Sequence, residues 1–375
     1  MADTVRKAKF KLLYNSVDIT NDITKYSTSI SYTDNDEGES DQVEVSLEDV
    51  DALWRNNWYP VKGDKLSLSI GFNDDDTLVS CGTFEIDEIT ISGPPDVVTI
   101  KAIAAGIKKA IRTKNSKSFE NQTLKQIANY IATKNKLTLV GNIANIQFER
   151  VTQHREKDLG FLRRISMEYG YLFSVRDNKL IFTSVFDIEA GKVVLEIDRS
   201  EIRSYSLKDK TADTYKAANV KYHNPGDNSV KKASVTTLSN KDNVTYKQIS
   251  TEDTIEIRSK AENPAQAELK ATAALHKHNS TQQEGTINIE GNPVFVAGNN
   301  ILLTGFGIMS GKYYVKKSTH KIDKSGGYVT TGDIKRTEVT ASSNQSSVKT
   351  QPKTAPFTVT NLTNRDAVSF KQIGQ

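Results

Sequence analysis

Several features that define common protein classes are scarce or missing in this sequence of 375 residues. It contains a single cysteine, Cys81, so an internal disulfide framework is excluded. Five histidines and one cysteine leave few ligands for a structural zinc site. Only 8 prolines and 21 glycines occur, which excludes a low-complexity Gly/Pro architecture. No apolar run approaches the ~18 residues that span a bilayer, so no membrane insertion is expected.

A dominant sign of charge is also missing. The chain has 50 Lys and Arg against 46 Asp and Glu, a net charge of +4. A dedicated nucleic-acid-binding protein should show one dominant sign, so specific nucleic-acid binding is not predicted. The charged N-terminal residues are not followed by the apolar segment of an export signal, so we expect synthesis in the cytoplasm.

Aromatic and aliphatic residues are present in the amounts that folded domains need. Hydrophobic residues make up 37% of the chain, with 14 Tyr, 13 Phe and 2 Trp. Disordered chains usually lack such aromatic residues. At roughly 150 residues per domain, the length predicts about two or three domains.

The first 106 residues are expected to form a small antiparallel β-barrel. Apolar and polar residues alternate in several short segments, most clearly in residues 42–48 and 65–70. This alternation is typical of strands with one face on a core and one in solvent. The run Gly93, Pro94, Pro95 interrupts the pattern and predicts a corner, because proline cannot donate to a strand ladder.

Residues 107–200 are expected to form an α+β domain. Apolar residues at i, i+3, i+4 and i+7 predict a helix over residues 122–135, with Asn121 as its N-cap. A second helix is predicted over residues 157–169, with Gly170 as its C-terminal stop. A β-hairpin is predicted directly after it.

Residues 201–336 are expected to form a second β-barrel that contains one helix. Alternating segments return in this part of the chain. The helix is predicted to begin after the cap Asn263, with Pro264 at its first position and Gln266 as capping-box partner. It should end near His278.

The last residues, 337–375, read as a flexible linker followed by a short docking tail. Residues 341–356 are rich in Ser, Thr, Asn, Gln and Lys, a composition typical of linkers. Apolar side chains that follow are predicted to bind a partner: Phe357, Val359, Leu362 and Phe370.

No catalytic or metal-binding motif stands out. A Gly-x-Ser-x-Gly elbow is missing, and Cys81 is predicted to be a buried small hydrophobic residue. His276 and His278 lie two apart on a helix, so they should point to different faces and lie in solvent at the helix end. His320 is predicted to be a structural residue within a strand. No cofactor is expected.

The Asp and Glu residues of the sequence leave two functional alternatives open, a calcium site and a cell-wall hydrolase. The run at residues 73–76, Asn-Asp-Asp-Asp, predicts a polar hairpin tip; a calcium site is the alternative, but the twelve-residue loop pattern is missing. A cell-wall hydrolase is the second alternative, because the paired carboxylates of such enzymes cannot be recognised by spacing.

Charges are unevenly distributed along the chain. Residues 34–51 contain nine Asp and Glu and no Lys or Arg, whereas residues 101–118 contain six Lys and Arg and no acidic residue. These blocks are interpreted as solvated faces. A more specific hypothesis is that the acidic block of one copy faces the basic block of a neighbouring copy in a ring. A third interpretation is that the basic block binds nucleic acid.

Three stretches in order resemble the phage late-control D protein family, the baseplate hubs of contractile tails. The first is residues 84–102, which contain the Gly-Pro-Pro corner, and the second is residues 153–173, which include the sequence Arg-Glu-Lys-Asp-Leu-Gly-Phe-Leu-Arg-Arg. The third is residues 298–331. Lys157 replaces the small hydroxyl residue that the family has before Asp158, which puts the helix cap there in doubt.

The resemblance implies a homotrimeric hub with two tube-like β-barrels and no enzymatic activity. Its implied partners are a central spike protein, a tail tube protein, other baseplate proteins and a tape measure protein, in the virion of a phage or in a tailocin assembled in the bacterial host cytoplasm. A related secretion or injection apparatus is the alternative. Structural roles are expected for the motif residues Gly93, Pro94, Pro95, Glu156, Asp158, Phe161, Leu162, Arg164, Gly170, Gly298 and His320. Of these, Glu156 and Arg164 are expected to form an ion pair, and Phe161 and Leu162 to hold the helix against its hairpin.

Overall fold

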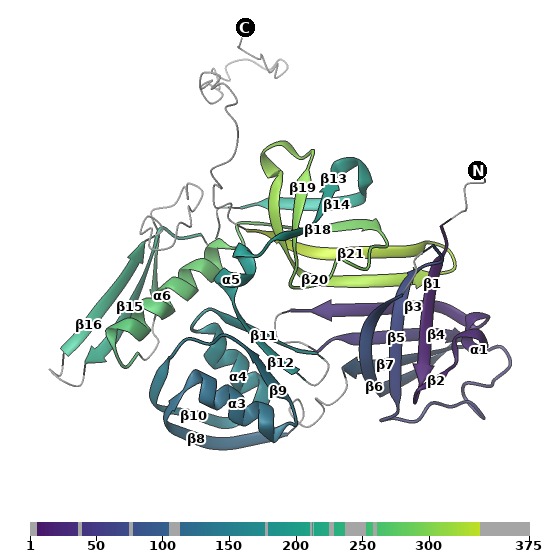
Figure 1. Cartoon of the computed structure of the whole chain (residues 1–375), viewed down its shortest axis with the longest axis horizontal. Coiled ribbons are helices and arrows are strands. Elements are labelled where there is room, and N and C mark those ends of the chain that lie inside the picture. Colours follow the sequence, from purple (N-terminus) through teal and green to yellow (C-terminus); the bar gives the residue numbers. More distant parts are fainter. Residues whose placement is uncertain are drawn as a thin grey trace, which may run out of the picture. The chain divides into compact units, whose positions relative to one another are not determined.

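Strands make up most of the chain in the computed structural model, which confirms the mainly β class predicted from the sequence (Figure 1). The chain divides into two units, residues 1–340 and residues 341–375. The structure describes residues 6–36, 40–74, 78–104, 113–176, 179–210, 212, 214–224, 229–236, 253–257 and 261–337. The tail residues Phe357, Val359, Leu362 and Phe370 lie outside this described part, and the domain boundaries stay predictions.

A 13-stranded, mainly antiparallel sheet contains the strands from both ends of the described chain. Its members are β1 (Ala8–Tyr14), β2 (Val17–Asp18), β3 (Ser27–Asn35), β4 (Gln42–Glu48), β5 (Lys65–Phe72), β6 (Val79–Ser92), β7 (Val97–Ala104), β13 (Val193–Asp198), β14 (Ile202–Asp209), β18 (Gln283–Glu290), β19 (Asn300–Thr304), β20 (Gly311–Asp323) and β21 (Gly327–Arg336). The main path runs β14-β18-β21-β20-β3-β4-β7-β6-β5-β1-β2, and β19 and β13 branch from β20.

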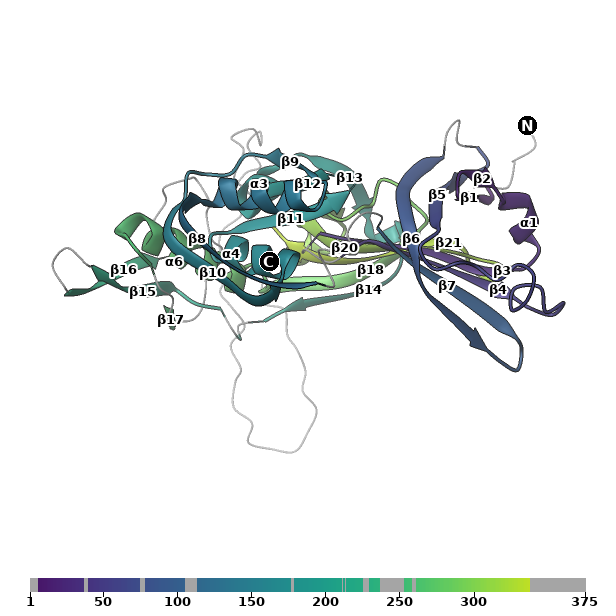
Figure 2. The same ribbon diagram turned by 90° about the horizontal axis from the view of Figure 1, so that it is seen from below.

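Strands β3 and β20 join the N-terminal strands to the C-terminal strands. Residues 29–35 pair antiparallel with residues 317–323, with Tyr32 opposite His320. Figures 1 and 2 show the two strands side by side. The sequence predicts both β regions but not this pairing, because partners so far apart in the chain leave no local pattern.

The alternation predicted for the first strands is confirmed. In β4 the side chains of Val43, Val45 and Leu47 are buried while their neighbours are more exposed. The Gly-Pro-Pro corner connects β6 to β7, as predicted. A short helix, α1 (Thr20–Thr24), was not predicted from the sequence.

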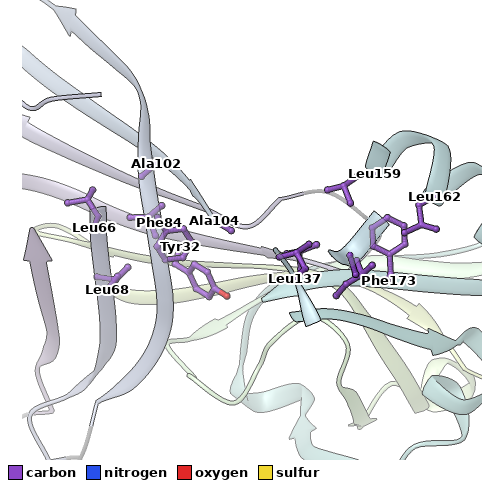
Figure 3. Close-up of a cluster of buried hydrophobic side chains, with 14 of the residues drawn as sticks. Tyr32, Leu66, Leu68, Phe84, Ala102, Ala104, Leu137, Leu159, Leu162 and Phe173 are labelled. Atoms are coloured by element: carbon purple, nitrogen blue, oxygen red, sulfur yellow. The ribbon is translucent and has the colours of Figure 1, made fainter. Parts of the chain in front are cut away.

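The middle of the chain combines helices and strands, as predicted. Here β8 (Lys114–Thr123) pairs with β10 (Gln147–Lys157), and a second small sheet has the order β11-β12-β9. Figure 3 shows buried apolar side chains of this part, including Leu162 and Phe173, in a cluster that also contains Phe84 of β6. The remaining elements are α3 (Leu124–Lys134), α4 (Asp158–Met167), β9 (Thr138–Gly141), β11 (Tyr171–Arg176) and β12 (Lys179–Ser184).

The N-cap predicted for the first of these helices is wrong. Helix α3 begins after Thr123, whose Oγ1 accepts a hydrogen bond from the N–H of Gln126 at 3.1 Å. The side chain of Gln126 accepts in return from the N–H of Thr123 at 2.8 Å, completing a capping box. Asn121 lies within β8 with a φ of 52°, where it cannot cap the helix.

Helix α4 carries the second family motif. It begins after Lys157, whose side chain makes no capping hydrogen bond, as the departure from the family pattern predicts. It ends at Met167, and Gly170 adopts a φ of +74°, which glycine tolerates far better than other residues. Phe161 and Leu162 are fully buried in the core beneath the helix.

The helix predicted from Asn263 is confirmed as α6 (Pro264–Asn279), with the side chain of Asn263 accepting from the N–H of Gln266. It packs on a separate three-stranded sheet of order β16-β15-β17, which has its own apolar core (Figures 1 and 2). The other elements of this half are α5 (Val185–Ala190), η1 (Arg199–Glu201), η2 (Gly307–Met309), β15 (Ala217–Asn224), β16 (Ser229–Thr236) and β17 (Thr254–Ile257). In the described part of the chain, no helix combines the length and apolarity needed to cross a membrane.

Candidate functional site

The polar residues of the α4 motif bind one another. Arg164 donates from Nη2 to Glu156 at 3.1 Å and from Nε at 3.3 Å, so the two residues form the ion pair that the sequence predicts. The same guanidinium donates to the carbonyl oxygen of Thr152 at 3.2 Å. Both partners are engaged in fixing α4 to β10, which fits a structural role.

Asp158 ties α4 to the neighbouring elements. Its carboxylate accepts hydrogen bonds from the side chains of Asn115, Lys134 and Gln153 at 2.9–3.1 Å. Burial acts to raise the pKa of this carboxyl, but the hydrogen bonds from Gln153, Lys134 and Asn135 outweigh it and hold the pKa below its usual range. The residue is therefore an ionised structural anchor at the start of the helix.

His320 lies buried at the pairing of β3 with β20. Its Nδ1 lies 2.9 Å from the hydroxyl oxygen of Tyr328 and 3.2 Å from that of Thr330, and its ring stacks on Tyr32. Burial lowers the pKa of His320 to about 4, so the ring is neutral at neutral pH. This environment is that of the structural histidine predicted from the sequence.

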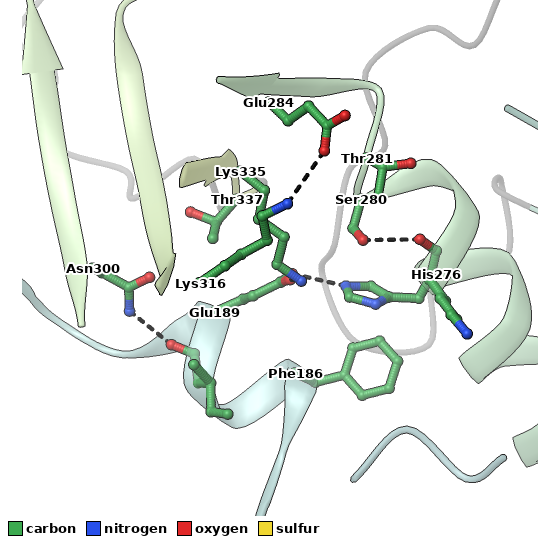
Figure 4. Close-up of polar contacts among 12 residues, drawn as sticks. Phe186, Glu189, His276, Ser280, Thr281, Glu284, Asn300, Lys316, Lys335 and Thr337 are labelled. Atoms are coloured by element: carbon green, nitrogen blue, oxygen red, sulfur yellow. Dashed lines mark hydrogen bonds and ion pairs between the residues drawn. The ribbon is translucent and has the colours of Figure 1, made fainter. Parts of the chain in front are cut away.

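His276 contradicts its prediction as a solvated residue. It is buried, and its Nε2 lies 2.8 Å from Oε2 of Glu189 on α5 (Figure 4). The other oxygen of Glu189 lies 3.0 Å from Nζ of the buried Lys335 on β21. Burial acts to raise the pKa of Glu189, and the interactions with His276 and Lys335 outweigh it and lower that pKa. His278 is half-buried and contacts the ring of Tyr215.

The acidic block at residues 34–51 is in large part not a solvated face. Asp34, Asp36, Asp41 and Asp49 are buried. Three of them accept backbone hydrogen bonds: Asp34 from Ala297 at 3.0 Å, Asp41 from Asn35 at 3.0 Å and Asp49 from Trp54 at 2.8 Å. These carboxylates stabilise loops within the chain, which removes them from any contact between copies.

The basic block lies partly outside the described residues, which omit 105–112. Of the described members, Lys114 and Lys117 are exposed, and Nζ of Lys117 lies 3.5 Å from the ring centre of Tyr130. The 73–76 hairpin is described only to Asp74, which pairs with Arg6 at 3.0 Å. No group of three or more His, Cys, Asp or Glu suited to a metal ion occurs among the described residues.

Cys81 has the surroundings of a packing residue. It is partly buried against the main apolar core, and burial raises the pKa of its thiol. A reactive cysteine requires the opposite shift, because the thiolate is the nucleophile. The Cys81 side chain therefore offers no activated nucleophile.

An apolar cavity of about 530 Å³ opens in the first β region, and the sequence analysis missed it. Its walls come from β1, β4, β5, β7, α1 and the loop after β4, and they include Leu12, Leu47 and Trp54. Trp58 and Tyr59 line it and are 44% and 45% exposed, so they form its lip. One feature of the sequence could have indicated this cavity: both tryptophans of the chain, Trp54 and Trp58, lie within five residues of each other.

Comparison with known proteins identifies relatives of this chain. A family model described as the Alg8 N-terminal domain matches residues 12–324. The probable baseplate hub protein of Escherichia phage 186 is 32% identical over 183 residues, 48% of this chain and 46% of that protein. That of Escherichia phage P2 is 34% identical over 175 residues, 46% of this chain and 44% of that protein. The chain thus spans about half the length of the curated relatives it matches.

Solved structures share the fold at low sequence identity. The 43 kDa tail protein of prophage MuSo2 from Shewanella oneidensis gives a TM-score of 0.65 at 15% identity, covering 87% of this chain and 98% of that one. An Escherichia coli component of the type VI secretion system, described as similar to the T4 bacteriophage tail proteins gp27 and gp5, gives 0.52 at 10% identity, covering 88% and 76%. The predicted resemblance to baseplate hub proteins is confirmed.

Proposed function

The chain belongs to the family described as the Alg8 N-terminal domain, and we propose that it is the structural hub of a contractile-tail baseplate. The observation that carries this proposal is the agreement of two independent likenesses. Sequence relatives are named baseplate hub proteins, and the fold over most of the chain is that of a phage tail protein.

We propose that the hub is a homotrimer that joins a six-fold tail tube to a three-fold central spike. In this proposal residues 1–106 and 201–336 are two tube-like barrels, so three chains place six similar barrels in a ring. Such a ring presents quasi-six-fold symmetry to the tail tube and true three-fold symmetry to the central spike. The single sheet that runs through both β regions supports this arrangement, because the β3–β20 pairing fixes one region against the other.

The proposed action is mechanical. The ring would nucleate assembly of the tail tube, hold the central spike and release it when the sheath contracts. Residues 107–200 would contact the spike, other baseplate proteins or the tape measure protein. The proposal needs no cofactor and no catalytic residue, and the motif residues Glu156, Asp158 and Arg164 serve it by anchoring α4.

A related secretion or injection apparatus is the second candidate. The likeness to a type VI secretion component at a TM-score of 0.52 favours it, since the same fold serves in such machines. The shared fold does not distinguish a phage or tailocin from a secretion apparatus, so the genes adjacent to this one discriminate among them.

Light scattering on the purified chain, alone and with its candidate spike, tests the proposal. The expected mass is about three times 41.6 kDa. A chain that stays monomeric and does not co-purify with spike contradicts the hub function. Release of peptidoglycan fragments by the pure protein would instead support the cell-wall hydrolase.

A further inference from the structure

Strand β17 forms one border of the three-stranded sheet that α6 covers. Residues 217–220 of β15 pair with residues 254–257 in parallel, and no other strand of the described chain pairs with β17. On its second side, β17 therefore has backbone N–H and C=O groups without a strand partner among the described residues. Such a strand edge can receive an extended segment of another polypeptide, which pairs with these backbone groups.

A groove of about 430 Å³ adjoins this strand and is bounded by α4 and α6. Its apolar walls are Ile255 and Ile257 of β17, Met167 of α4 and Ala274 of α6. Ile255 and Ile257 are two residues apart, so their side chains lie on the same face of the sheet. Both are only partly buried against the apolar core under α6. The volume lies within the range of roughly 300–1,000 Å³ that is typical of ligand pockets.

The charged side chains that line the groove include one cation without a counter-ion. Nζ of Lys270 lies 2.7 Å from a carboxylate oxygen of Glu168, and Arg164 is paired with Glu156 at 3.1 Å. Lys277 also lines the groove, is exposed and forms no ion pair with any residue that the structure describes. A carboxylate on an occupant would therefore find an available opposite charge at Lys277.

We infer that β17 is a docking edge for an extended segment of a partner protein, which adds to the sheet as a fourth strand. The segment carries apolar side chains at alternate positions and an acidic side chain on the same face. Its backbone pairs with β17, its apolar side chains contact Ile255, Ile257 and Ala274, and its carboxylate meets Lys277. This inference goes beyond the proposed hub function and does not depend on it.

An extended peptide fits this site better than a small molecule does, because the edge and the groove make different demands. The edge offers a row of backbone donors and acceptors, which the backbone of a neighbouring strand matches at a spacing of about 4.8 Å. In such a strand, every second side chain projects to the face on which Ile255 and Ile257 lie. Alternate side chains of one segment can thus occupy the groove while its backbone extends the sheet.

The probe is a fluorescein-labelled peptide, Asp-Thr-Val-Thr-Val-Thr-Asp, whose Asp and Val side chains share one face in either strand direction. Fluorescence anisotropy with the full chain should show saturable binding with a Kd below about 1 mM. A peptide with Lys in place of both Asp should bind about fivefold more weakly. Two further peptides are N-methylated on the Thr amides or on the Val amides. One of them should bind at least about tenfold more weakly than the other, because only alternate residues of a strand face a given neighbour.

Lys277→Glu should weaken binding of the Asp peptide about fivefold, whereas Lys125→Glu, at an exposed lysine on α3, should leave it unchanged. Absence of saturable binding, equal binding of the Asp and Lys peptides, or equal binding of the two N-methylated peptides would overturn the inference. Binding only to a chain that lacks residues 357–375, or dissociation of self-associated copies by the peptide, would assign the edge to this chain itself and also overturn it. The hub function stands in each of these cases.

Discussion

The imidazole of His276 on α6 lies 2.8 Å from the carboxylate of Glu189 on α5, although 87 residues separate them in the sequence. Lys335 on β21, which Figure 4 shows beside Glu189, binds the other carboxylate oxygen at 3.0 Å. Lys312 on β20 donates to the backbone carbonyl of Glu189 at 2.6 Å. One short helix thus connects α6 with the large sheet. Because these groups are largely buried, removing one of them should lower the free energy of unfolding.

Glu189→Gln should destabilise the chain by roughly 3 kcal/mol or more, because it leaves the buried Lys335 without its opposite charge. Since the folded-state pKa of Glu189 is lowered, its stabilisation is present above the ordinary carboxyl range and is lost as pH falls through the folded value. Denaturant unfolding at neutral pH measures the loss. Glu284→Gln is the control, since Glu284 pairs with Lys210 and Lys316 in a partly exposed site and should cost about 1 kcal/mol or less. Equal effects of the two variants would contradict the buried connection.

His320 should make stability depend on pH. Its folded pKa of about 4 lies below the ordinary value of 6.5, so between these values the unfolded chain binds a proton that the folded chain does not. Above pH 6.5 the contribution of His320 to the free energy of unfolding should therefore not change with pH. On acidification to about pH 4 the free energy of unfolding should fall by roughly 3 kcal/mol in total. The free energy of unfolding of His320→Gln, measured at a series of pH values in this range, should change less steeply with pH than that of the wild-type protein. His154, which is exposed, provides the control His154→Gln, and an identical slope in all three proteins would refute the prediction.

Leu162 should be intolerant of charge. Its side chain is fully buried beneath α4, so Leu162→Asp should place an unpaired carboxylate in the core and leave the protein insoluble. Leu162→Met keeps the apolar character and should cost less than about 1.5 kcal/mol. Soluble expression and thermal unfolding of both variants check this, and normal folding of Leu162→Asp would overturn the assignment of the helix face.

Deletion of residues 357–375 should leave thermal unfolding of the remaining chain unchanged and weaken one partner contact. The reason is compositional, because residues 341–356 have a linker composition and separate this segment from residues 1–340. Calorimetry of the full and shortened chains, with co-purification of spike and tube proteins, tests it. Loss of the melting transition in the shortened chain would show that the segment belongs to a core.

Local patterns in the sequence were sufficient for most elements. Alternation in residues 42–48 predicted β4, Asn263 and Pro264 predicted the start of α6, and the Gly-Pro-Pro run predicted the corner between β6 and β7. Each of these depends on residues adjacent in the chain. The same locality explains the wrong cap at Asn121, since the hydroxyl of Thr123 caps a helix as well as an Asn side chain does, and Gln126 stands three residues later to complete a capping box.

By itself, therefore, the sequence determined the class of fold, the apolar faces of the alternating strands and amphipathic helices and, through three short motifs, the resemblance to baseplate hubs. The tertiary structure alone decided what each buried face meets. It paired β3 with β20, placed His276 against Glu189 and turned four carboxylates of the acidic block inward. It also assembled the Trp54 cavity from five separate elements and a loop. Periodicity records that a side chain is shielded from water, but the partner of a buried charge or strand edge comes from a distant segment, and no local pattern records it.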